Sequence, residues 1–236
     1  MRRSGEPLAI VGAGIGGLSA AVALQGHGIP VLVLERASCA TPVGAGISLW
    51  PNAVQALDAL GVGAAVRARG ERVLTSTLRT CTGRTLSELD LAALSGDGGA
   101  PLLMIHRADL HDVLAAALAP GVVRYGCELC DYSVKADCVE VKLAGGASLT
   151  AVALIGADGV ASRVRTKLLP GHEPRDHDVV AVRAVIDSIA LGRGSAFEAW
   201  GDGMVFGAAP LSGSRVYWYA AAGRRTIEAS EQRLAA

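Results

Sequence analysis

Residues 10–21 read Ile-Val-Gly-Ala-Gly-Ile-Gly-Gly-Leu-Ser-Ala-Ala, and this stretch decides the fold. The apolar run from Leu8 to Val11 ends at the glycine cluster, which is typical of a buried strand. Leu18 to Leu24 is small and apolar at the density of a helix, and Val31 to Leu34 is a second run of strand type. The sequence therefore predicts strand, tight turn, helix and strand, the opening of a Rossmann-like α/β domain.

Three glycines of this stretch, Gly12, Gly14 and Gly17, fill the pattern G-x-G-x-x-G. Gly12 permits the tight turn, and Gly17 lets helix and strand pack closely. Gly14 lets the backbone approach a pyrophosphate at the positive N-terminus of the helix. The pattern predicts a dinucleotide site.

An acidic residue, Glu35, follows Gly17 by eighteen residues, at the end of the second predicted strand. A carboxylate there accepts hydrogen bonds from the two hydroxyls of an adenosine ribose, and it repels a 2′-phosphate, which disfavours tightly bound NADP. NAD and FAD remain equally compatible with this pattern. The structural alternative is a glycine-rich buried turn followed by a solvated glutamate.

Composition excludes several classes of function. Hydrophobic residues make up 51% and charged residues 19% of the 236 residues, which indicates a globular chain. Lys and Arg number 22, as do Asp and Glu, and no basic run occurs, so no nucleic-acid partner is expected. The stretch from Pro7 to Leu34 lacks charged residues, but glycines and Pro30 interrupt it, so we expect no integral membrane span.

The five cysteines are an odd number in a chain that is too long to need a disulfide framework, which favours a reducing cytoplasm. Cys127 and Cys130 form a lone C-x-x-C without a second ligand pair, so we expect neither metal nor redox chemistry there. The five histidines are scattered, and we expect them to be solvated. No metal site is predicted.

Three later segments separate NAD from FAD: Gly44 to Ala53, Ile105 to Leu110, and Leu154 to Arg165. The second places Arg107 on the first turn of a helix, and the third contains Gly-Ala-Asp-Gly. With these three in order behind G-x-G-x-x-G and Glu35-Arg36, the chain resembles the FAD-dependent aromatic hydroxylases, single-component flavin monooxygenases similar to para-hydroxybenzoate and salicylate hydroxylases.

The resemblance implies a GR2-type flavoprotein fold, a Rossmann-like FAD-binding domain with a β-sheet substrate domain. We expect the FAD-binding domain at residues 1–72 and 102–176 and the substrate domain at 73–101 and 177–236. The resemblance implies that the family continues beyond the position of Ala236, through the remaining substrate sheet to a second flavin motif, Gly-Asp followed by small residues. This motif does not occur here, and 179–236 resembles only the first strands of the substrate domain, so we expect that domain to be partial.

The resemblance also implies roles for individual residues. Arg107 reaches the ribityl and phosphate region, and Asp158-Gly159 lies near the pyrophosphate, where Asp158 organises hydrogen bonds rather than pairing directly. A loop of Gly46, Ile47 and Ser48 runs along the flavin, and the backbone of Leu129 meets the adenine. The purely structural alternatives are that Arg107 is a solvated residue at a helix start and that Asp158 only forms a turn. The complete set of expected cofactor residues is Gly12, Gly14, Gly17, Glu35, Arg36, Gly46, Ile47, Ser48, Arg107, Leu129, Asp158 and Gly159.

The implied activity is hydroxylation of an aromatic or other electron-rich small molecule through a flavin C4a-hydroperoxide, after reduction of FAD by NADH or NADPH. No catalytic residue is assigned. We expect an apolar substrate wall from the later strands, whose aromatic and apolar candidates are Val205, Phe206, Tyr217, Trp218 and Tyr219. Urate is disfavoured, because the urate-hydroxylating branch has an arginine shortly after a corresponding Gly-x-Gly, where this chain has Met204-Val205. Turnover is expected to need further sequence or a second chain; the alternative is a non-catalytic FAD-binding or interaction protein.

The remaining periodicity predicts further elements. Helices are expected over Pro51–Leu60, Ala108–Leu118 and Ser162–Leu169, hairpins over Arg72–Leu89 and Val139–Ile155, and strands over Val179–Ile186, Ala196–Trp200, Met204–Ala209 and Val216–Ala221.

Overall fold

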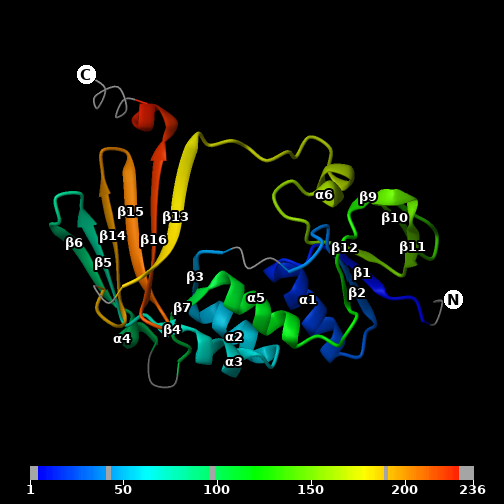
Figure 1. Ribbon diagram of the computed structural model, residues 1–236, viewed down its shortest axis with the longest axis horizontal. Coiled ribbons are helices and arrows are strands. Elements are labelled where there is room, and N and C mark those ends of the chain that lie inside the picture. The colour runs from blue at the N-terminus through cyan, green and yellow to red at the C-terminus, as the bar shows by residue number, and fades with distance from the viewer. Residues whose placement is uncertain (1–4, 41–43, 96–98, 189–190, 229–236) are drawn as a thin grey trace. The chain divides into compact units, whose positions relative to one another are not determined.

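The structure, a computed structural model, describes residues 5–40, 44–95, 99–188 and 191–228 (Figure 1). Backbone contacts divide the chain into two units, each made of two segments. The first unit comprises Met1–Pro42 and His111–Arg175, and the second comprises Val43–Leu110 and Asp176–Ala236.

A four-stranded parallel sheet forms the centre of the first unit, in the order β12-β1-β2-β8. Its strands are β1 (Leu8–Val11), β2 (Val31–Leu34), β8 (Val123–Arg124) and β12 (Leu154–Gly156), and helix α1 (Ile15–Gly26) connects β1 to β2. The predicted strand, turn, helix and strand are therefore confirmed, as is the α/β fold class. Ile10 and Val33 are fully buried in this sheet because parallel strands are covered on both faces.

A three-stranded antiparallel sheet in the order β11-β10-β9 completes the first unit. Its strands are β9 (Leu129–Val134), β10 (Val139–Leu143) and β11 (Ser148–Ala151), and a short helix, α6 (Arg163–Leu168), follows β12. The turn between β10 and β11 is the 3₁₀ element η1 (Ala144–Gly146). Tyr132, Val141 and Val164 belong to one buried apolar cluster with residues of β1 and β2, so this sheet packs onto the parallel sheet.

One predicted strand of the first unit is wrong. We expected a single strand from Ser148 to Ile155, but the run divides at Val152 and Ala153 into β11 and β12. The first half pairs antiparallel with β10, and the second pairs parallel with β1.

The second unit contains a small antiparallel sheet in the order β3-β7-β4. Its strands are β3 (Gly46–Leu49), β7 (Leu103–His106) and β4 (Glu71–Arg72), accompanied by helices α2 (Pro51–Ala59), α3 (Gly63–Arg69) and α4 (Leu91–Ser95). Helix α5 (Arg107–Ala116) begins in the second unit and ends in the first. Gly46 to Ser48, expected to be a loop, is instead an edge strand paired with β7.

A six-stranded sheet in the order β13-β16-β15-β14-β5-β6 dominates the second unit (Figure 1). Its strands are β5 (Thr75–Thr80), β6 (Thr85–Asp90), β13 (Val179–Asp187), β14 (Ser195–Gly201), β15 (Met204–Leu211) and β16 (Arg215–Gly223). All pairings are antiparallel except that of β14 with β5. The strands and the hairpin predicted for these residues are confirmed.

The two units cut the chain at other points than the expected domains do, since 43–72 and 102–110 group with the six-stranded sheet. The two units are defined by backbone contacts, whereas the expected domains are defined by the ligand that each binds. The domain boundaries therefore stay a prediction. Among the described residues, none of the helices combines the length and the apolar composition needed to cross a bilayer. None of the five cysteines, which all lie within the described residues, forms a disulfide.

Candidate functional site

The turn between β1 and α1 requires glycine at two of the three motif positions. Gly12 has φ +101°, and a Cβ there would overlap the carbonyl oxygen of Ala157. A Cβ on Gly17 would overlap the carbonyl oxygen of Gly12 itself. The fold alone therefore explains Gly12 and Gly17, as a tight turn and a close helix contact.

Gly14 is different, because nothing in the fold requires glycine there. Its φ is −71°, which any residue adopts, and a Cβ would have no atom within 4 Å. Gly14 is the N-cap of the twelve-residue helix α1, which has no side-chain cap and no acidic residue in its first turn. The N-terminus of α1 thus presents backbone N–H groups and positive potential to open space, a cradle that suits a pyrophosphate.

The carboxylate of Glu35 is held by two backbone groups. Oε2 accepts a hydrogen bond of 2.8 Å from the N–H of Ala13, and Oε1 accepts one of 2.9 Å from the N–H of Ala37. Each carboxylate oxygen retains acceptor capacity beyond these bonds. Glu35 is therefore fixed beside the glycine turn, where the sequence places the ribose hydroxyls, and it is not the solvated glutamate of the alternative interpretation.

His111 holds the other backbone polar group of Ala13, its carbonyl. Its Nε2 lies 2.9 Å from the carbonyl oxygen of Ala13. Because a carbonyl only accepts, Nε2 carries the hydrogen. The expectation that all histidines are solvated is wrong for His111, whose side chain is only 21% exposed. No sequence motif marks this contact.

Asp158 organises the start of α6. Its Oδ1 accepts a hydrogen bond of 2.5 Å from the hydroxyl of Ser162, and its Oδ2 accepts bonds from the N–H groups of Arg163 and Val164 at 2.7 and 3.2 Å. These bonds satisfy N-terminal groups of the helix. Gly159, with φ +83°, makes the turn that brings the carboxylate to the helix. The hydrogen-bonding role expected of Asp158 is thus filled by its own helix.

Two further expected residues of the first unit have contrasting surroundings. Leu129 begins β9, is 3% exposed and belongs to the apolar cluster. Its side chain therefore packs in the core, and the backbone contact with adenine stays a prediction. Arg36 is exposed beside Glu35.

The second unit contains the remaining expected residues. Gly46 packs against the ring of Tyr217, which a Cβ would overlap, so glycine is required there by the neighbouring sheet. Arg107 is exposed at the first position of α5, and its backbone N–H donates to the carbonyl of Ala45 over 2.9 Å. The predicted position of Arg107 at the start of a helix is confirmed.

A cavity of about 580 Å³ lies within the second unit, between β3 and one face of the six-stranded sheet. Gly46, Ile47 and Ser48 line it together with Tyr217 and Tyr219. Three residues expected along the flavin therefore share a cavity with two aromatic residues expected in the substrate wall.

Glu198 contributes the one carboxylate among the described residues that line this cavity. The hydroxyl of Tyr219 donates to its Oε1, and Nε1–H of Trp200 donates to its Oε2 over 3.0 Å. Burial, followed by the hydrogen bond with Glu198, raises the pKa of Tyr219 far above its usual range. Sequence reasoning missed Glu198; the available signal was a single carboxylate in an otherwise apolar predicted strand, Ala196–Trp200.

The aromatic residues expected in one substrate wall divide between two faces of the sheet. Tyr217 and Tyr219 stack on one face, with ring centroids 5.8 Å apart. Phe206 and Trp218 stack on the other, at 6.1 Å. Strand alternation is the reason, since successive residues point to opposite faces.

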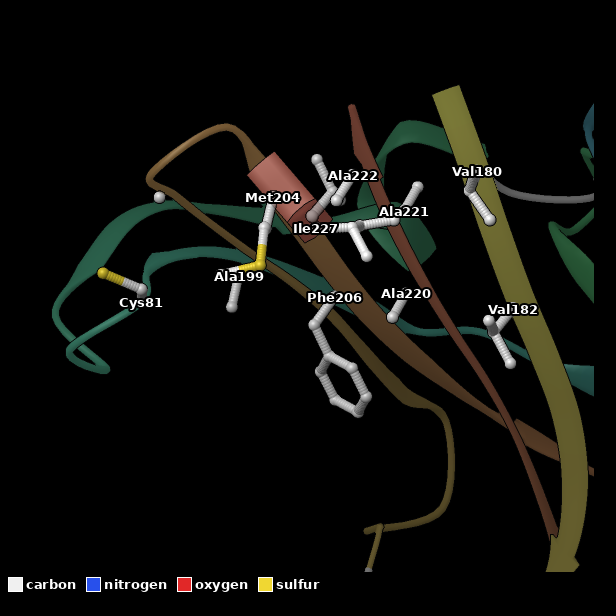
Figure 2. Close-up of a pocket in the computed structure, with 12 residues that line it drawn as sticks. Cys81, Val180, Val182, Ala199, Met204, Phe206, Ala220, Ala221, Ala222 and Ile227 are labelled. Atoms are coloured by element: carbon white, nitrogen blue, oxygen red, sulfur yellow. The ribbon is translucent and has the colours of Figure 1, made fainter. Parts of the chain in front are cut away.

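The opposite face carries a second cavity, of about 460 Å³ (Figure 2). Figure 2 shows Val180, Val182, Met204 and Phe206 around it, with Cys81 at one side. It contains no carboxylate, imidazole, guanidinium or amine among its described lining residues, so it offers little for chemistry. Nor do the described residues bring three His, Cys, Asp or Glu side chains together as metal ligands would.

A parallel sheet, a glycine turn with an open helix N-terminus and an anchored acidic residue after β2 define the class of dinucleotide-binding α/β proteins. The chain belongs to the FAD binding domain family, which it matches over residues 6–233. This match confirms the family resemblance and FAD as the cofactor.

Two curated relatives of the chain are named as enzymes. The aurachin C monooxygenase/isomerase of Stigmatella aurantiaca is 36% identical over 93% of this chain and 58% of its own length. The 3-hydroxybenzoate 6-hydroxylase 1 of Aquipseudomonas alcaligenes is 38% identical over 88% of this chain and 55% of its own length. The chain thus spans little more than half the length of these relatives.

A solved structure supports the fold in the same way. A variant of HpxO from Klebsiella pneumoniae, complexed with FAD, has a TM-score of 0.84 and 28% identity, covering 97% of this chain and 62% of HpxO. Another HpxO structure contains FAD and uric acid. The sequence-based exclusion of urate for this chain stays a prediction.

Proposed function

We propose that this chain is the FAD-binding part, together with a portion of the substrate sheet, of a flavin-dependent monooxygenase that hydroxylates a small aromatic molecule. The observation that carries the proposal is the glycine turn. Gly14 stands at an uncapped helix N-terminus with open space beside it, which suits a pyrophosphate and which the fold itself does not explain.

In the first unit, we assign the adenosine diphosphate half of FAD to the turn and its neighbours. The N–H groups at the start of α1 bind the pyrophosphate, and Glu35 accepts hydrogen bonds from the ribose hydroxyls. Asp158 and Gly159 shape the chain near the pyrophosphate through α6, and the backbone of Leu129 contacts the adenine. Arg36 is assigned to the same half through the family resemblance.

In the second unit, we assign the flavin half to Gly46, Ile47, Ser48 and Arg107. The cavity shared by the first three with Tyr217 supports this assignment, because the reacting part of the cofactor and the substrate ring must meet in one place. Arg107 supplies a fixed cation with several donors toward the ribityl and phosphate groups.

Bound FAD, reduced by NADH or NADPH, supplies the oxygen-transfer chemistry expected from the sequence. The protein's own task is to position an aromatic ring and to exclude water from it. The aromatic groups of Trp50, Tyr217 and Tyr219 provide an apolar wall for that purpose.

The length of the chain relative to its relatives bears on what residues 1–236 can do alone. The chain spans 58% and 55% of the two curated relatives. We propose that residues 1–236 alone bind FAD weakly and need further sequence for turnover. A non-catalytic FAD-binding or interaction protein is the second candidate, and the second chain considered from the sequence has no support in the comparisons.

The test is to purify residues 1–236 and to release any bound nucleotide by heat for chromatography. We expect FAD in less than one equivalent, and saturable FAD binding on titration. Incubation with FAD, NADH or NADPH and a panel of phenols is expected to yield hydrogen peroxide without hydroxylated product. A bound nicotinamide nucleotide, or no FAD binding at all, contradicts the proposed function, whereas coupled hydroxylation contradicts the requirement for additional sequence.

A further inference from the structure

The cavity beside β3 contains one fixed charge whose partners come from its own wall. Glu198 on β14 receives a hydrogen bond on each carboxylate oxygen, from the phenol of Tyr219 on β16 and from the indole of Trp200 on its own strand. All three residues line the cavity. A carboxylate with two donors on its flanks is held in one orientation and keeps acceptor capacity for a ligand.

The strand register brings these groups together. Glu198 pairs with Gly207, and Gly207 pairs with Tyr219, so the three residues form a row across β14, β15 and β16. Gly207 has no side chain between the two polar groups, and a Cβ there would overlap the ring of Tyr219. The missing side chain therefore permits the contact between Tyr219 and Glu198.

The phenol remains a donor at physiological pH. Burial and the adjacent carboxylate both raise the pKa of Tyr219, so it stays protonated and points its hydrogen at Glu198. The negative charge on Glu198 is therefore not cancelled by a proton from its neighbour, and it is presented to the cavity.

No basic side chain offsets this charge among the described residues that line the cavity. Arg183 on β13 lies on the same face of the sheet, because it pairs with Tyr219, and its charge acts on Tyr217. Arg183 is exposed and does not line the cavity. Glu198 is thus the one carboxylate, with no lysine, arginine or histidine beside it, among the described residues that line the cavity.

We propose that Glu198 is a specificity-determining residue that selects neutral or cationic aromatic substrates carrying a hydrogen-bond donor and rejects aromatic carboxylates. The inference rests on the proposed function and adds a substrate class to it. A hydroxyl or N–H group on the ring donates to Glu198, whereas a carboxylate meets a like charge in a partly desolvated cavity. This class differs from that of the relatives named for 3-hydroxybenzoate.

The test compares two ligands of nearly equal shape, 3-hydroxybenzamide and 3-hydroxybenzoate. Each is titrated into residues 1–236 at about pH 7.5, with and without excess FAD, and binding is followed by ligand-observed NMR. We expect the neutral amide to bind at least about tenfold more tightly than the anion. FAD binding is measured separately on the same samples. Failure to bind FAD would contradict the proposed function, whereas the ratio of the two ligand affinities tests the role of Glu198.

Three variants locate the effect. Glu198→Gln keeps the size and one acceptor but removes the charge, and it should bring the two affinities within about threefold of each other. Tyr219→Phe removes a donor but keeps the charge, so the preference for the amide should persist. Arg183→Gln should leave the preference unchanged. Circular dichroism and thermal unfolding check that each variant is folded.

Three results would overturn the proposal. Equal or tighter binding of 3-hydroxybenzoate by the unaltered chain overturns the proposal without any variant, and loss of that binding in Arg183→Gln would assign specificity to Arg183. An unchanged ratio in Glu198→Gln overturns the role of Glu198. Failure of both ligands to bind overturns the assignment of this cavity to an aromatic substrate.

Discussion

The backbone N–H of Ala13 donates a hydrogen bond of 2.8 Å to Oε2 of Glu35, 22 residues further along the chain. This bond joins the glycine turn to the end of β2, the two features by which the sequence predicts a dinucleotide. Glu35 therefore has two tasks in our assignment: it positions the turn and it binds the ribose.

We expect Glu35→Ala to weaken FAD binding about 10- to 150-fold, because a hydrogen bond to a charged group contributes roughly 1.5–3 kcal/mol. Fluorescence titration of FAD measures the change. Glu35→Gln is the matched control: it retains a carbonyl acceptor for one N–H and should lose less affinity than the alanine variant. An unchanged FAD affinity in Glu35→Ala would refute the ribose assignment.

The glycine turn offers a second matched pair. Gly14→Ala should leave unfolding unchanged or slightly raise stability, since φ is −71° and the added methyl group meets no atom within 4 Å. It should nevertheless weaken FAD binding, because the methyl group occupies the approach to the pyrophosphate.

Gly12→Ala should behave in the opposite way and destabilise the chain by at least about 2 kcal/mol, since its φ is positive and the methyl group overlaps Ala157. Urea unfolding and FAD titration of both variants separate the two effects. If Gly14→Ala binds FAD as tightly as the unaltered chain, the pyrophosphate does not lie against Gly14.

Elements whose limits are marked locally were predictable from the sequence. β1 and β2 are apolar runs bounded by Gly12 and Pro30, and α2 has Pro51 at its first position. Their signals lie within a few residues of the element itself. The α/β class followed from them, whereas FAD as the cofactor was implied by the family resemblance that the three later segments carry.

Elements defined by distant partners were not predictable in the same way. Ala151 to Leu154 contains no turn residue, yet the chain changes sheet there, because Leu154 pairs with Ala9 in the parallel sheet. Likewise Gly46 becomes a strand through pairing with His106. Tertiary pairing overrides the local pattern in both cases.

For the site residues, the sequence predicted which residues would form hydrogen bonds but not which groups would be their partners. Asp158 was expected to organise hydrogen bonds, but its partners on α6 depend on the turn at Gly159. Glu198 escaped notice because a lone carboxylate in a strand belongs to no motif, and its importance comes from Tyr219 on another strand.

His111 supplies a further prediction about the glycine turn. Its bond to the carbonyl of Ala13 complements the bond from the N–H of Ala13 to Glu35, so both backbone polar groups of Ala13 are held. His111→Phe should lower FAD affinity about 3- to 10-fold, as expected for loss of one neutral hydrogen bond. His111→Gln retains a donor and should recover most of the affinity. Equal losses in both variants would mean that packing rather than hydrogen bonding matters at this position.

The tyrosines make stability depend on pH in the alkaline range. Burial is the largest cause that raises the pKa of Tyr125, Tyr217 and Tyr219, to which the charge of Glu35 adds for Tyr125 and the contact with Glu198 adds for Tyr219. In the unfolded chain tyrosine titrates near about pH 10. The folded chain therefore holds more protons than the unfolded chain above that pH, so the free energy of unfolding falls as the pH rises.

The stability contributed by these groups is fully present below about pH 10 and is lost progressively above it. Urea unfolding at several pH values between about 8 and 11 measures the fall, and absorbance at the phenolate band should show late titration of the three groups. Tyr219→Phe removes the group with the largest shift, so its stability should be lower at pH 8, where the bond to Glu198 is missing, but should fall less steeply above pH 10. A variant curve that runs parallel to that of the unaltered chain across this range would show that Tyr219 ionises equally in both states, and that the phenol is not held protonated against Glu198.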